Sequence, residues 1–154
     1  MSGVSVTQFR DHIVQPTLAA MGLYTKSAER LVLGTALTES ALTFVKQIGE
    51  GPALGFYQME PETERDIWEN YLNYRDKLAD KVREFKIGMQ TELIGNNYYS
   101  TAMCRIHYLR IPVPLPKEDD IAGMAQYWKD HYNTSKGKGK SIDFVEKAKV
   151  AFEI

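Results

Sequence analysis

One glutamate of this chain lies where a titratable group is unexpected, at the end of a long uncharged run. Residues 31–38 read LVLGTALT, and Glu39 and Ser40 follow directly. An uncharged helical run of this length belongs in a core, so its last turn brings the Glu39 carboxyl to the edge of that core. On a helix, Val32 and Ala36 share the face of Glu39. The spacing therefore predicts a carboxyl with apolar neighbours.

Two effects then raise the pKa of the Glu39 carboxyl: loss of water beside apolar side chains and the negative end of the helix dipole. A carboxyl that stays protonated near neutral pH is what a general acid for glycosidic cleavage needs. Spacing alone still favours the simpler alternative, a helix-end glutamate that is exposed or paired with a lysine such as Lys46.

A longer pattern around and after Glu39 favours the catalytic interpretation over the exposed or paired glutamate. It reads TES at 38–40 and GFYQ at 55–58, followed by Pro61 and Thr63. This pattern resembles the soluble lytic transglycosylases, a family of lysozyme-like enzymes that cleave peptidoglycan. Their signature is a catalytic Glu-Ser at a helix end, then a Gly-Leu-Met-Gln phrase, then Pro and Thr. In this chain Phe56 and Tyr57 replace the Leu and Met of that phrase.

Two later segments resemble the family less closely. Asn97, which opens a helical pattern that reaches Tyr108, resembles its third motif. The stretch AQYWKDHYN resembles its final Tyr-Asn motif, whose tyrosine bonds the catalytic carboxylate. Either Tyr127 takes that role, with Trp128 in place of the Asn, or Tyr132 does, with the asparagine that follows it. We favour Tyr127, and packing of both rings in the core or at its rim is the competing interpretation.

The resemblance implies a mechanism with one carboxylate. Glu39 would protonate the glycosidic oxygen between N-acetylmuramic acid and N-acetylglucosamine, then draw a proton from the 6-hydroxyl of the sugar to close a 1,6-anhydro ring. Ordinary glycosidases need two carboxylates, and Glu50 and Glu60 are candidates for a second acid, which would favour hydrolysis. The substrate contacts that the resemblance implies come from Ser40, Gly55, Tyr57, Gln58, Tyr108, Tyr127 and Tyr132.

The elements that must position these residues are helices. Apolar residues recur at helical spacing in the stretches 6–20, 27–43, 61–72, 76–85, 97–109, 119–128 and 141–152. Candidate caps are Thr7, Thr25 or Ser27, and Ser141. Pro16 should kink or split the first helix, and Gly22 should end it. Residues 46–58 form a turn-rich loop or a small hairpin. We predict a single, mainly α, lysozyme-like domain over residues 1–154, with a small loop or β-hairpin beside the active-site cleft.

Composition sets limits on partners and cofactors. The chain has 154 residues and a net charge of -1, so no global basic field favours nucleic acid, and the cluster of Lys136, Lys138 and Lys140 is expected to be a solvated loop. A single cysteine, Cys104, excludes an internal disulfide and a CxxC metal site and is expected to be buried. The three histidines lack metal-ligand spacing. We expect no metal and no cofactor.

The expected function is cleavage of peptidoglycan strands by lytic transglycosylation. The first residues lack the apolar core of a secretory signal, and no window is long and apolar enough for a membrane span. These features and the whole-chain pattern look most like bacteriophage members of the family, either virion-associated or released from the host cytoplasm to act in the cell wall. Other virion proteins are then candidate partners. The alternatives are a lysozyme-type hydrolase and a non-catalytic phage structural or glycan-binding module.

Overall fold

The computed structural model describes residues 3–134 and 137–154, so Lys136 of the basic cluster lies outside the described residues. Helices dominate these ranges, and the prediction of a mainly α protein is confirmed. Within the same ranges there is no strand. Two isolated antiparallel bridges join Leu54 to Lys46 and to Met59, so the stretch 46–58 is a loop, one of the two predicted alternatives, and not a hairpin. No helix in the described ranges is long and apolar enough to cross a membrane.

The N-terminal helical path has a wide turn in its middle. Helix α1 (Val6–Phe9) leads into a π-helical segment (Arg10–Val14) and then into α2 (Gln15–Ala20). Pro16 lies in the first turn of α2, where its missing N–H matters least, and the π turn before it adjusts the helix around the proline. Ser5 caps α1 in place of the expected Thr7, accepting the N–H of Gln8 at 3.3 Å.

Helix α3 (Lys26–Ser40) is buried along most of its length, as the uncharged run at residues 31–38 predicts. Its cap is Thr25, whose hydroxyl accepts the N–H of Ala28 at 3.0 Å. The helix ends at Ser40, earlier than expected, because Ala41 and Leu42 both take a positive φ of 53°. The left-handed turn sends the chain away immediately after Glu39 and Ser40.

The remaining helical segments are α4 (Pro61–Asn70), a 3₁₀ turn (Leu72–Tyr74), α5 (Asp76–Glu84), α6 (Glu92–Gly95), α7 (Asn97–Leu109), α8 (Ile121–Trp128), the π-helical segment η3 (Lys129–Asn133), α9 (Ser141–Ala148) and a closing 3₁₀ turn (Lys149–Phe152). Most of them follow the predicted stretches, whereas α6 and η3 lie outside these stretches. The start of α9 differs in its cap: Lys140 takes that position, and its N–H donates to Asp143 at 2.8 Å.

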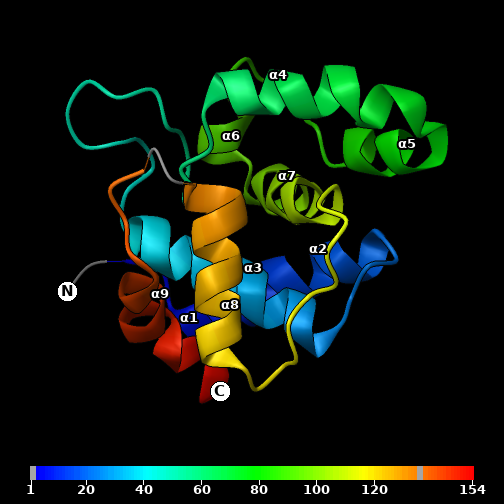
Figure 1. Ribbon diagram of the computed structural model, residues 1–154. Helices are drawn as coiled ribbons and strands as arrows, with labels where there is room; N and C mark the ends of the chain where they lie inside the picture. The colour runs from blue at the N-terminus through cyan, green and yellow to red at the C-terminus, as the bar shows by residue number, and fades with distance from the viewer. Residues whose placement is uncertain (1–2, 135–136) are drawn as a thin grey trace.

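Two hydrophobic clusters meet at α7. One joins the N-terminal helices with α3, α8 and α9, and the other joins α4, α5 and α6. Helix α7 gives Cys104 and Tyr108 to the first cluster, and Met103 and Ile106 to the second. In Figure 1, α4 and α5 lie across the top, α7 runs below them, and α3, α8 and α9 lie lower still. The Cys104 thiol is fully buried, as predicted.

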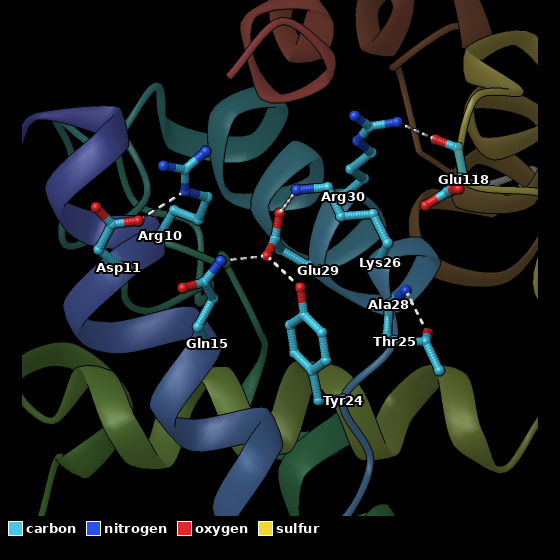
Figure 2. A network of polar contacts seen from close by, with 10 residues as sticks. All are labelled: Arg10, Asp11, Gln15, Tyr24, Thr25, Lys26, Ala28, Glu29, Arg30 and Glu118. Carbon is cyan, nitrogen blue, oxygen red and sulfur yellow. Dashed lines mark hydrogen bonds and ion pairs between the residues drawn. The ribbon is translucent and has the colours of Figure 1, made fainter.

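A buried carboxylate fastens the N-terminal helical path to α3 (Figure 2). The Glu29 side chain is 0% exposed and accepts hydrogen bonds from Gln15 at 2.7 Å, Tyr24 at 2.9 Å and Lys26 at 2.9 Å. Burial alone raises the pKa of Glu29, but the three donors together outweigh it and hold that pKa below its ordinary value. The ionised carboxylate therefore stabilises the fold.

We expect Glu29→Gln to lower the free energy of unfolding by about 2–3 kcal/mol near pH 7, because the donors lose their charged acceptor. Since the folded pKa of Glu29 lies below the unfolded one, its contribution is present above the ordinary value of 4.5 and is lost as the pH falls through the folded value. Denaturant unfolding at acidic and neutral pH should show that the difference in free energy of unfolding between the wild type and Glu29→Gln becomes smaller as the pH falls. The control is Glu153→Gln, which changes an exposed side chain. A difference of constant size at every pH would contradict this account.

Candidate active site

A cleft of about 690 Å³ opens where the end of α3 meets the loop before α4, the facing side of α7 and η3. A smaller cavity of about 330 Å³ lies next to it, on the side of α9. Glu39, Gln47 and Gln58 line both spaces. The Glu39 carboxyl therefore lies at the junction of two hollows, where a chain-like ligand can extend to either side of it.

The carboxyl of Glu39 is partly buried and holds one strong hydrogen bond. The indole Nε1 of Trp128 donates to Oε2 of Glu39 over 2.9 Å. Burial raises the pKa of Glu39 to about 7, while the hydrogen bond from Trp128 and the positive charge of Lys147 lower it by smaller amounts. The predicted elevation of the pKa thus has desolvation as its main cause. Near neutral pH this carboxyl is available both with and without its proton.

Ser40 fastens the end of α3 to the loop that precedes α4. Its hydroxyl oxygen lies 2.7 Å from the carbonyl oxygen of Phe56 and accepts the N–H of Leu42 at 3.2 Å. The residue is 3% exposed, and although it borders the smaller cavity, its hydroxyl is engaged by the backbone. The expectation that Ser40 offers its hydroxyl to a sugar is therefore corrected: it holds the loop that carries Gln58.

Gly55 and Gln58 have different surroundings in the loop before α4. Gly55 has a φ of +77°, and a Cβ on it would overlap the carbonyl oxygen of Leu93, so it allows the loop to pack against α6. It does not line the cleft, against expectation. Gln58 does line the cleft, and its φ of +49° is a strained conformation for a residue with a side chain. Its amide nitrogen donates to the Gly55 carbonyl at 2.9 Å.

Two of the expected substrate-binding tyrosines belong to the core. The Tyr57 hydroxyl lies 2.8 Å from the hydroxyl of Thr101, and the Tyr108 hydroxyl lies 2.7 Å from that of Thr35. Each tyrosine is 1% exposed. The expectation that Tyr57 and Tyr108 contact substrate is corrected, because both rings and both hydroxyls are enclosed by the protein.

The tyrosine expected to meet Glu39 is replaced by a tryptophan. Tyr127 donates its hydroxyl to the Val113 carbonyl at 2.9 Å, so the preference for Tyr127 is wrong. Tyr132 lines the cleft, but its hydroxyl donates to the carbonyl of Tyr57 at 2.6 Å. Adjacent residues of a helix point about 100° apart, so α8 can direct only one of Tyr127 and Trp128 at Glu39. It directs Trp128.

Several residues of the site carry no signal in the sequence. Gln47, His107, Arg110, His131 and Lys147 line the cleft or the smaller cavity. They come from a loop, the end of α7, η3 and α9, and no local pattern marks them. Only the docking of those elements brings them together.

The two candidate second acids differ in position. Glu60 is exposed and lines the cleft beside the start of α4, whereas Glu50 is exposed and is not one of the residues that line it. Over the described ranges, no group of three histidine, cysteine or acidic side chains is arranged to hold a metal ion. Of the two candidates, Glu60 is therefore the one placed to act as a second catalytic carboxylate.

No protein-family model, no curated protein and no solved structure matches this chain. Its function must therefore be inferred from its own residues and from the geometry of the cleft.

We expect Glu39→Gln to stabilise the fold at alkaline pH. Because the folded pKa is about 7 against an ordinary 4.5, stability is lost as the pH rises through the folded value and the buried carboxyl ionises. The variant keeps an oxygen acceptor for Trp128 without a charge, so its free energy of unfolding should exceed that of the wild type by roughly 2 kcal/mol above about pH 8 and match it near about pH 4. Denaturant titrations measure this difference, with Glu60→Gln as the exposed control. Equal stability of the wild type and Glu39→Gln throughout would mean that Glu39 is solvated.

Proposed function

We propose that this chain cleaves the glycan strands of peptidoglycan by lytic transglycosylation, with Glu39 as its acid and base. One observation carries the proposal: a partly buried carboxyl with a pKa of about 7 lies where two cavities meet. A polymer that is cut within its length needs room on both sides of the catalytic group. A carboxyl with this pKa is suited to give and to take a proton near pH 7.

In the first step the protonated carboxyl gives its proton to the glycosidic oxygen. Trp128 already donates to Oε2, so Oε1 is the oxygen that carries the proton to the substrate. The bond between C1 and that oxygen breaks, and the leaving strand departs with a hydroxyl group. In the second step the carboxylate takes the proton of the C6 hydroxyl, and O6 bonds to C1 of the same sugar. The product ends in a 1,6-anhydro ring, and Glu39 is protonated again.

The loop beside Glu39 supports this proposal. Gln58 is held in a strained conformation at the cleft, a kind of backbone that concentrates at ligand-binding sites. Tyr132 and Ser40 hold the same loop through the carbonyls of Tyr57 and Phe56. This segment resembles the soluble lytic transglycosylases, and the whole-chain pattern looks most like the bacteriophage members of that family. The resemblance extends the proposal to an enzyme of a virion or of host lysis, with the cell wall as its place of action.

We expect Glu39→Gln to lower the rate of cell-wall clearing by at least about 100-fold, because the amide cannot supply a proton. Wild-type activity should fall as the pH rises above about 7, where Glu39 loses its proton. Zymography and turbidity loss on purified peptidoglycan measure both effects, with circular dichroism to verify folding. Equal clearing by both proteins would remove Glu39 from the mechanism. No clearing by either would favour a glycan-binding module.

Hydrolysis is the second candidate, because Glu60 lines the same cleft and could activate a water molecule. The products separate the two reactions. Mass spectrometry of sugar fragments should find 1,6-anhydro ends for transglycosylation and reducing ends for hydrolysis. Glu60→Gln should leave the rate nearly unchanged if the reaction is transglycosylation and lower it by about 100-fold if the reaction is hydrolysis.

We expect Trp128→Phe to move the alkaline limb of the pH–rate profile to higher pH. The indole N–H favours the ionised carboxyl, so its loss raises the pKa of Glu39 further above 7. The matched control is Phe144→Leu. The centroid of the Phe144 ring lies 6.0 Å from that of Trp128, and Phe144 makes no hydrogen bond to Glu39. A limb that moves equally in both variants would show that packing, not the hydrogen bond, sets this pKa.

A further inference from the structure

Arg110 brings a fixed positive charge to the cleft. It follows the last residue of α7, lines the cleft that also contains Glu39, and its side chain is 22% exposed. Its Nη1 donates to Asp66 of α4 over 2.6 Å, and its Nη2 donates to Nδ1 of His107 over 3.2 Å. An arginine on an open surface would be mobile; this one is oriented from two sides.

The His107 ring beside it is neutral. A guanidinium can only donate, so Nδ1 of His107 is the acceptor and Nε2 carries the hydrogen, which it donates to the His131 carbonyl at 3.0 Å. Burial and the charge of Arg110 lower the pKa of His107 to about 4. Asp66 is the counter-ion of Arg110; its side chain is 48% exposed and is not among the cleft-lining residues.

The guanidinium keeps donors for a ligand. It has five N–H groups, and the two contacts with Asp66 and His107 use one hydrogen on each terminal nitrogen. An oriented and partly dehydrated guanidinium binds a carboxylate well, because little freedom is lost when the contact forms. The other charged groups that line the cleft are carboxyls, Glu39 and Glu60. Arg110 is therefore the place in the cleft where an anionic group gains most.

We propose that Arg110 forms a carboxylate-binding subsite for the acidic side group of a muramic acid residue in the bound strand. This inference rests on the proposed function and narrows its substrate. A glycan of N-acetylglucosamine alone is uncharged. Muramic acid brings a carboxylate either on its lactyl group or, when a peptide is attached there, on the peptide stem. The enzyme would thus distinguish peptidoglycan from chitin by charge.

The test is calorimetric titration of Glu39→Gln, which cannot turn over, with three oligosaccharides of equal length. They are a chitin oligomer, a peptide-free muramyl oligomer and a peptide-bearing one. Adding Arg110→Gln should weaken binding of at least one muramyl oligomer roughly 10-fold and leave the chitin oligomer unchanged. The oligomer that loses affinity identifies the lactyl or the peptide carboxylate as the ligand. The affinity that Arg110→Gln removes should also be the part of the affinity that decreases as the salt concentration rises.

Asp66→Asn is the matched structural control. It removes the competing negative charge but keeps an amide oxygen that can accept from Nη1 of Arg110, so Arg110 keeps its charge and a partner on α4, and muramyl binding should persist or strengthen. An equal loss for all three oligomers, or a loss shared by Asp66→Asn, would overturn the carboxylate subsite and leave the proposed function standing. A Glu39→Gln protein that binds none of the three would overturn both.

Discussion

The Glu39 carboxyl lies between two opposing electrostatic influences. Removal from water favours its neutral form, while the indole N–H of Trp128 and the charge of Lys147 favour its ionised form. Desolvation is the larger effect, and the pKa of about 7 is the result. A much deeper burial would leave an acid unable to act as a base, and an open surface would leave it ionised at neutral pH.

This balance depends on the position of Glu39 in a cleft whose walls come from both hydrophobic clusters. Helix α3 ends at the surface of one cluster. The far wall of the cleft is formed by α4 of the other cluster and by α7, which contributes to both. The loop between α3 and α4 is held by the Ser40 and Tyr132 hydroxyls, both of which bond its carbonyl oxygens. These contacts offset the strained backbone of Gln58 and keep it beside the carboxyl.

The tryptophan at this position has a chemical consequence. In the transglycosylases that the motifs resemble, a tyrosine hydroxyl meets the carboxylate, and a hydroxyl can both donate and accept. The indole N–H of Trp128 can only donate, so Oε2 of Glu39 must be an acceptor. The carboxyl proton is thereby confined to Oε1, and no second protein group competes for it among the described residues. Under the proposed function, that restriction directs the proton toward the substrate.

The sequence by itself determined most of the helices and the exceptional place of Glu39. Caps such as Thr25 and the recurrence of apolar residues depend on near neighbours in the chain. The eight uncharged residues at 31–38 belong in a core, so Glu39, which follows them, lies at the edge of that core. Only the tertiary structure decided which side chain meets Glu39. Tyr127 and Trp128 are adjacent and both apolar enough to be buried, so the rotation of α8 against α3 made the choice. Arg110 likewise reached the cleft through helix docking, because contacts between residues far apart in the chain leave no periodic trace in it.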